Sequence, residues 1–235
     1  MSAPDHKRRS FVYRRLIAER MSFAARGDGG LGRRPEPPGS AAGLRLVDLS
    51  VVPRWGLKGR DALPWLGRHD AATPSANNLA TRQQDGTLIA RLSPAEALIL
   101  ASPVHGGSLL APAIDAMAAA GEGACYPVPR RDSHCWFLLM GDEAPNLLAR
   151  LCAVDLSAGV FADFGVAQTS LAGLSTIIIR NDLAGLAFFL LADSASAEYL
   201  WDCLLDAMTE FAGVVCGAEV FSITSPGGPG PAPGS

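Results

Sequence analysis

Two serines in the segment "LLADSASAEYLWDCLLDAM" (190–208) stand where an enzyme could hold a nucleophile. Ser194 and Ser196 follow an apolar run typical of a strand and precede a run with helical spacing. A serine nucleophile needs an activating base, and at a strand–turn–helix corner it usually lies in a GxSxG turn. The segment contains neither a histidine nor that motif. The pattern therefore favours the start of a helix, with Asp193 or Ser194 as the N-cap.

The residues after this cap predict an amphipathic helix. Its apolar residues recur at helical spacing and would share one face: Ala197, Leu200, Trp201, Leu204, Leu205, Met208 and Phe211. Glu198 would lie in the first turn, where the positive end of the helix favours a carboxylate. Cys203 lies within the same helix, where we interpret it as a small core or flanking residue.

A second polar cluster is the run "VPRRDSHCW" (128–136). Its charged residues directly precede an apolar run of strand length, so they would gather at one end of a strand. Such a corner could be an active site. Arginine and tryptophan are also enriched at protein interfaces, and we interpret the corner as a polar loop or a subunit contact. The interface candidates are Arg54, Trp55, Arg130, Arg131 and His134.

Other chemical motifs are weak. Gly106 and Gly107 precede a predicted helix, whose N-terminus could hold an anion, but no GxGxxG or Walker lysine accompanies them. The five cysteines are widely spaced and the four histidines scattered, which favours free thiols and no metal site. We therefore expect no catalytic, cofactor-binding or metal-binding residue on this chain.

Composition limits the partners. The net charge is −3 with a pI near 5.8, which provides no overall attraction to nucleic acid or to an anionic membrane. No apolar run reaches the roughly 18 residues that span a bilayer, and the N-terminal segment lacks the apolar region of a secretion signal. We expect a cytoplasmic protein that binds neither nucleic acid nor membrane.

Both ends of the sequence resemble appendages. Residues 1–43 hold nine of the twenty basic side chains and end in a Pro/Gly-rich run, so we expect a disordered basic extension. The tail 225–235 is also rich in proline and glycine, and we expect it to be disordered. Residues 44–224 would then form the folded domain.

The second half of that domain shows alternating strand and helix patterns. A strand over 134–140 precedes a helix within 142–154. Segment 166–180 is rich in β-branched residues and interrupted by Gly173, which predicts a bent strand. A hairpin partner (186–192), the helix described above and a last strand (218–224) complete a β-α-β-β-α-β order.

The first half repeats this order less clearly. It shows a strand at "RWGLKG", a helix at "RDALPWLG", a hairpin with Asp85-Gly86 at its turn, a further strand and the helix "LLAPAIDAMAAAG". Two echoes support a duplication: "GRDALPWL" with "GDEAPNLL", 82 residues later, and "AIDAM" with "LLDAM", 91 residues later. We predict an α+β fold of two ferredoxin-like βαββαβ units, 44–124 and 125–224.

Several long segments resemble the gamma subunit of heterotetrameric sarcosine oxidase. They include "LVDLSVVPRWGLKGRDALPWL", "NNLATRQQDGTLIARLSPAEALIL", "VPRRDSHCWFLLMGDEAPNLLARLCAVDL", "FADFGVAQTSLAGLSTIIIR" and the serine segment above. The similarity covers most of 44–222. That family is distantly related to the glycine-cleavage T-protein, so the resemblance implies its duplicated, folate-binding-domain-like α+β fold.

The resemblance also implies a role without redox chemistry on this chain. In such complexes a direct alpha partner holds NAD and a folate-binding domain. Beta and zinc-binding delta subunits complete the heterotetramer. FAD, FMN, NAD, zinc and tetrahydrofolate are thus expected on other subunits. Folate-dependent aminomethyltransferases carry a "GG-x-x-DD" motif after a hairpin, whereas this sequence has 85–90 as "DGTLIA" and lacks the acidic pair.

Three functions follow as alternatives. The first is a structural gamma subunit of a sarcosine oxidase that demethylates sarcosine and passes the one-carbon unit to tetrahydrofolate. The same role in an N-methylglutamate or dimethylglycine dehydrogenase complex is the second. The third is a stand-alone folate-binding one-carbon transfer protein, for which Asp48, Asp85 and Asp132 are the plausible carboxylates.

Overall fold

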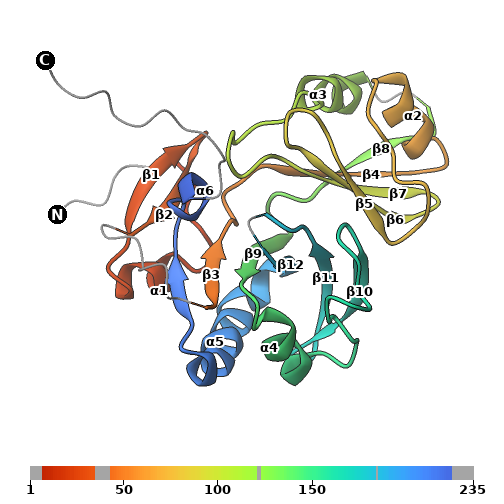
Figure 1. Cartoon of the computed structure of the whole chain (residues 1–235). Coiled ribbons are helices and arrows are strands. Elements are labelled where there is room, and N and C mark those ends of the chain that lie inside the picture. Colours follow the sequence, from red (N-terminus) through yellow and green to blue (C-terminus); the bar gives the residue numbers. More distant parts are fainter. Residues whose placement is uncertain (1–6, 35–42, 121–122, 184, 224–235) are drawn as a thin grey trace, which may run out of the picture.

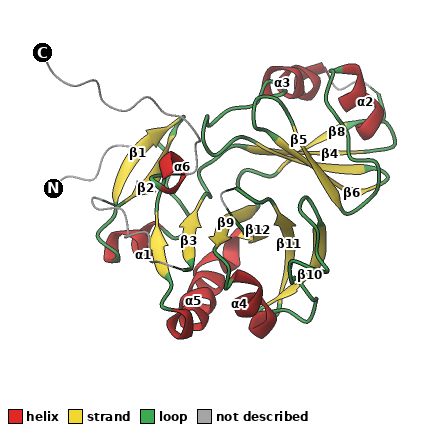
Figure 2. Cartoon of the chain, viewed as in Figure 1, coloured by secondary structure: helices red, strands yellow, loops and turns green. Residues whose placement is uncertain are grey.

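The computed structural model describes residues 7–34, 43–120, 123–183 and 185–223. Its α+β fold places two β-sheets face to face, with helices on the outer side of each sheet (Figures 1 and 2). One buried cluster fills the space between the sheets, and one lies between each sheet and its helices. The predicted fold class is confirmed.

The first unit comprises five strands and two helices. In chain order these are β4 (Arg54–Lys58), α2 (Ala62–Arg68), β5 (Leu79–Arg82), β6 (Leu88–Ser93), β7 (Glu96–Leu100), α3 (Ala111–Ala120) and β8 (Tyr126–Pro129). The hairpin between β5 and β6 turns at Asp85 and Gly86 as predicted, and Gly86 has the positive φ of 80° that such a turn needs.

The second unit repeats the same order. It runs through β9 (His134–Met140), α4 (Ala144–Leu151), β10 (Val166–Leu171), β11 (Leu174–Arg180), β12 (Ala187–Asp193), η1 (Ser194–Ser196), α5 (Ala197–Met208), η2 (Thr209–Phe211) and β13 (Val214–Cys216). Each unit is therefore β-α-β-β-β-α-β, one strand longer than the predicted β-α-β-β-α-β order. The further strand predicted in the first half is present as β7.

The sheets show the duplication directly. The first-unit sheet has the order β5-β6-β7-β4-β8, and the second has β10-β11-β12-β9-β3-β13. Strand β3 (Arg45–Asp48) precedes both units in the sequence. It pairs with β9 of the second unit, just as β8 pairs with β4 of the first. The predicted boundary at 124/125 therefore needs correction, because β3 pairs with the second unit and β8 with the first.

Two further element predictions were wrong. Segment 166–180 is a hairpin rather than one bent strand, since Ala172 and Gly173 both have positive φ and reverse the chain. Segment 218–224 is not the last strand. That strand is β13, three residues long, and the apolar residues after it form the short helix α6 (Val220–Ile223). Residue 224 lies outside the described residues.

The described part of the N-terminal extension is folded, which corrects the prediction of disorder. It forms α1 (Tyr13–Ala18) and a hairpin of β1 (Ser22–Arg26) and β2 (Gly29–Arg33) beside β3 (Figure 1). Val12, Leu16 and Leu31 are buried in the clusters on either side of the second sheet. Neighbours distant in sequence thus supply the apolar contacts that the segment lacks by itself. Residues 1–6, 35–42 and the tail 225–235 lie outside the described residues.

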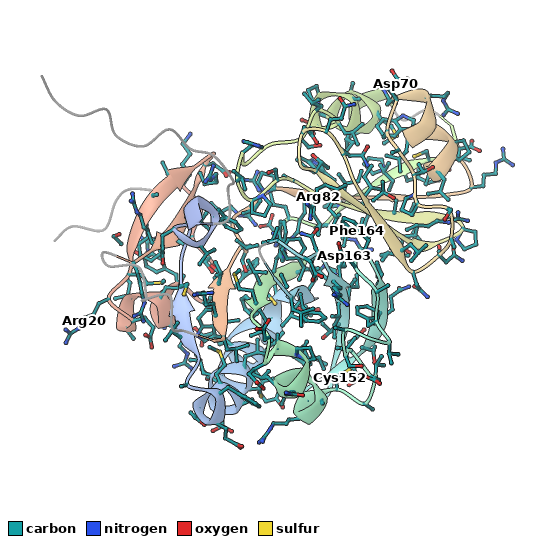
Figure 3. All side chains as sticks on the ribbon, in the orientation of Figure 1. Arg20, Asp70, Arg82, Cys152, Asp163 and Phe164 are labelled. Atoms are coloured by element: carbon teal, nitrogen blue, oxygen red, sulfur yellow. The ribbon has the colours of Figure 1, made fainter. Side chains whose placement is uncertain are left out.

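The units also meet along the free edge of β5. Leu79 forms a β-bridge with Gly165, and the Asn78 carbonyl accepts a bond from the Val166 amide at 2.9 Å. Arg82 of β5 lies over the Phe164 ring, 5.3 Å from its centroid (Figure 3). These contacts join the outer strands of the two sheets.

The serine segment is a helix cap. The Asp193 carboxylate accepts a bond from the Ala195 amide at 2.8 Å, and Ser194 Oγ donates to the Asp132 carbonyl at 2.7 Å. The helix α5 then buries the apolar face predicted from spacing, with Leu200, Trp201 and Leu204 fully enclosed. The predicted cap and helix are confirmed.

We expect Asp193→Ala to lower the free energy of unfolding by about 1 kcal/mol, because the capped amide loses its acceptor. Ser196→Ala is the matched control, since Ser196 makes no side-chain cap, and it should change that free energy by less than about 0.5 kcal/mol. Urea titration of both variants measures the difference. Equal losses would show that the Asp193 carboxylate is not the cap.

Candidate functional site

The polar corner predicted from the sequence is organised around Arg54. This side chain, at the start of β4, is only 1% exposed. Its guanidinium donates to the carbonyls of Ser50 and Val52, both at 3.0 Å, and of Arg130 at 3.1 Å. It also donates to the carbonyls of Arg131 at 2.8 Å and of His134. Arg54 therefore ties the chain before β4 to the loop before β9.

Asp48 lies close to this arginine and is also buried. Its carboxylate accepts the Ser50 amide at 3.0 Å, while Ser50 Oγ accepts the Trp136 amide at 3.1 Å. Burial raises the pKa of Asp48, against the opposing effect of the hydrogen bonds from its serine neighbours and the charge of Arg54. Burial lowers the pKa of Arg54 to about 10, so the guanidinium stays charged at neutral pH.

The two arginines of the loop are paired within the chain. Arg130 forms an ion pair with Glu96 at 2.5 Å, and Arg131 forms one with Asp28. Arg8, from the N-terminal segment, donates to the Arg131 carbonyl and pairs with Asp132, both at 2.6 Å. The N-terminal segment thus closes over the corner.

The structure brings all five interface candidates to this corner but changes the role of one. Arg54 is enclosed, and its donors are already used by backbone carbonyls, so it does not present a contact surface to a partner. Trp55, Arg130, Arg131 and His134 are half-buried and keep part of their surface open. The burial of Arg54 could not be predicted from the polarity of its sequence neighbours, since it depends on carbonyls of a distant loop.

His134 is the histidine of this corner, and its surroundings shift its pKa. Ser133 Oγ and the His134 Nδ1 atom lie 2.8 Å apart. Burial lowers the pKa of His134 to about 4, and the nearby charges of Arg130 and Arg54 add to that shift. The imidazole is therefore neutral in the folded protein at neutral pH.

We expect the wild-type protein to lose stability as the pH falls from about 6.5 to about 4. In that window the unfolded chain binds a proton at His134 that the folded state does not, so unfolding is favoured. The loss is about 1–2 kcal/mol, after allowance for solvent around this half-buried ring. His134→Gln should flatten this slope in urea titrations across the window. An unchanged slope would contradict the assignment.

The three carboxylates considered for one-carbon chemistry serve structural contacts. Asp85 Oδ1 accepts the Thr87 amide at 2.8 Å, and its Oδ2 accepts Thr87 Oγ1 at 2.9 Å and the Leu109 amide at 2.8 Å. These hydrogen bonds outweigh partial burial and lower the pKa of Asp85. Asp48 is enclosed as described, and Asp132 pairs with Arg8.

A cavity of about 420 Å³ lies beside Asp85, between the hairpin turn and the loop before α3, and His69 and Arg82 also line it.

The sequence also predicted a weak anion site at the start of the helix that follows Gly106 and Gly107. Asp85 already accepts the Leu109 amide, two residues before α3, so a carboxylate of the chain itself takes that position.

All five cysteines are free, as their spacing predicts. Within 7–34, 43–120, 123–183 and 185–223, no cluster of three or more potential metal-ligating side chains occurs. In the same ranges, no helix combines the length and apolar character needed to cross a membrane.

No protein-family model and no curated protein sequence matches this chain. Among solved structures, a chain of the "Heterotetrameric Sarcosine Oxidase from Corynebacterium sp. U-96 in complex with pyrrole 2-carboxylate" superposes with a TM-score of 0.65 at 19% identity, covering 88% of this chain and 97% of that one. The glycine cleavage system aminomethyltransferase T from Bartonella henselae superposes with a TM-score of 0.68 at 15% identity. It is matched over 92% of this chain and 61% of its own length. The chain shares the fold of these proteins.

Proposed function

We propose that this chain is a non-catalytic assembly subunit of the gamma type in a heterotetrameric, flavin-dependent sarcosine oxidase. The observation that carries the proposal is the extent of the structural match, which includes 97% of a chain from such an oxidase. The aminomethyltransferase, by contrast, is matched over only 61% of its length. A subunit of the same size and fold is thus a known component of one such assembly.

The state of the carboxylates also supports a structural role. An aminomethyl transfer would need a carboxylate that is free to meet a substrate amine. Asp85, at the hairpin that corresponds to the "GG-x-x-DD" motif, instead accepts three hydrogen bonds from its own chain. Asp48 faces serines and an arginine within the core.

In this proposal the alpha subunit contacts the chain directly, and beta and delta complete a cytoplasmic complex that demethylates sarcosine. FAD, FMN, NAD, zinc and tetrahydrofolate would lie on those other subunits. The same role in an N-methylglutamate or dimethylglycine dehydrogenase complex is compatible with this chain, because the amine would bind elsewhere. The open surfaces of Trp55, Arg130, Arg131 and His134 are proposed contacts.

Purification of the tagged chain from its own organism tests the proposal. We expect stoichiometric recovery of a flavoprotein, with flavin absorbance in the complex and none in the isolated chain. Arg54→Met, which we expect to be strongly destabilised, is the control. If the partner binds the folded chain specifically, this variant should recover less of the flavoprotein. Recovery of a stable monomer that binds tetrahydrofolate and transfers a methylene group would replace the proposal with the stand-alone folate protein.

A further inference from the structure

Because the fold is duplicated, the helix pair of the first unit can be compared with the helix pair of the second. In the second unit, α4 and α5 pack on each other over the outer face of their sheet. Leu147 of α4 and Leu204 of α5 are fully buried there. At the end of α4, Arg150 pairs with Glu210 and lies over the ring of Phe211, 5.3 Å from its centroid. A carboxylate and an aromatic ring thus contact this arginine, whose side chain is still 47% exposed.

The first unit has an arginine at the corresponding position, but among the described residues that arginine lacks a paired carboxylate and an aromatic neighbour of this kind. The two sequence echoes align Arg68 with Arg150, and Ala113 and Ala119 with Leu204 and Glu210. Position 120, which aligns with Phe211, is also alanine in the sequence. Arg68 forms no ion pair or hydrogen bond with any residue that the structure describes. The positions that align with Leu204, Glu210 and Phe211 therefore lack the larger side chains that α5 and η2 carry there.

A cavity of about 540 Å³ lies between α2 and α3. Its volume is within the range of small-molecule sites. Trp65, whose ring is 4.2 Å from that of His69, forms one wall, and Ala113 and Met117 form the other. Cys125 also lines the cavity, and burial raises the pKa of its thiol against the opposing charge of Arg68, so the thiol is uncharged at neutral pH.

The charge of the cavity favours an anion at one end. Asp61 also lines the cavity, and its Oδ1 atom lies 3.7 Å from Nε of Arg60. Arg68 remains as an exposed guanidinium beside an aromatic and apolar surface. A guanidinium binds a carboxylate through paired charge-assisted hydrogen bonds, and the rings of Trp65 and His69 provide contacts for a planar ring.

We propose that this cavity between α2 and α3 binds a small planar aromatic carboxylate. The carboxylate of the ligand takes the place that Glu210 has in the second unit, and its ring takes the place of Phe211. The ligand pairs with Arg68 and packs between Trp65 and Met117. Such a ligand completes the outer face of the first unit, independently of which complex the chain belongs to.

Calorimetric titration of the full chain tests this site with indoleacetate as the probe. We expect indoleacetate to bind at least about tenfold more tightly than indoleacetamide, which lacks the charge and cannot form a charge-assisted pair with Arg68. Cyclohexaneacetate, which lacks the aromatic ring, should also bind more weakly. Equal binding of the acid and the amide, or no binding of either, overturns the proposal.

Variants separate the site from a general affinity for anions. Arg68→Gln should weaken indoleacetate binding by about tenfold or more. Arg150→Gln is the matched control and should leave binding unchanged, since Arg150 is paired with Glu210 and lies in the other unit. Ala113→Leu with Ala119→Glu introduces two of the three aligned second-unit side chains and should abolish binding while the circular dichroism spectrum is retained. Unaltered binding in Arg68→Gln, or in the folded double variant, overturns the proposal.

Discussion

Replacement of Arg54 by methionine is expected to lower the free energy of unfolding by about 3–5 kcal/mol. Methionine keeps most of the volume but donates no hydrogen bond, so five backbone carbonyls lose a partner in a buried site. Asp48 would also lose the positive charge that opposes its burial. Because domains of this kind are stable by only about 5–15 kcal/mol, much of the protein should unfold at moderate temperature.

Two further substitutions make this test specific. Arg54→Lys keeps the charge but supplies three donors in place of the planar fork of five, so we expect an intermediate loss of about 2 kcal/mol. Arg60→Met removes an arginine whose side chain is 85% exposed, and it should change stability by less than about 0.5 kcal/mol. Urea unfolding followed by circular dichroism measures all three. A loss in Arg54→Met no greater than in Arg60→Met would contradict the role of Arg54.

The second large effect is expected at the glycines that follow the first strand of each unit. Gly59 and Gly141 have φ of 124° and 128°, a conformation that side chains rarely adopt. A Cβ at Gly59 would lie 2.0 Å from the Ala124 carbonyl oxygen, and one at Gly141 would lie 1.9 Å from that of Gly43. Each alanine substitution should cost about 3 kcal/mol or more, because backbone strain adds to a backbone clash.

Gly67→Ala is the control for these substitutions. Gly67 lies in helix α2, and nothing lies within 4 Å of the position of its Cβ. Alanine favours the helix, so this variant should gain about 0.5–1 kcal/mol. Thermal unfolding of the three variants gives the comparison. Similar melting temperatures in Gly59→Ala and Gly67→Ala would show that the chain relaxes around the clash.

The predictable features were local ones. The apolar spacing from Ala197 to Met208 and the aspartate before it specified α5 and its cap, because helical periodicity and capping depend on residues within a few positions. The echo of Gly59 in Gly141 indicated the duplication, and both glycines have the same conformation and the same close contact beside a neighbouring strand. Segment 166–180 was misread because a turn at Ala172 and Gly173 lacks the usual asparagine or aspartate signal.

Sequence alone determined the α+β class, the repeat and the residues that gather near His134, since these follow from periodicity and from order along the chain. Tertiary structure decided what those residues do. Arg54 is a structural residue because carbonyls from a distant loop surround it. The N-terminal segment folds because sheet residues distant in sequence enclose its few apolar side chains. The cavity beside Arg68 lies between two helices, α2 and α3, and short side chains of α3 line it. Such effects depend on contacts between elements that no local pattern encodes.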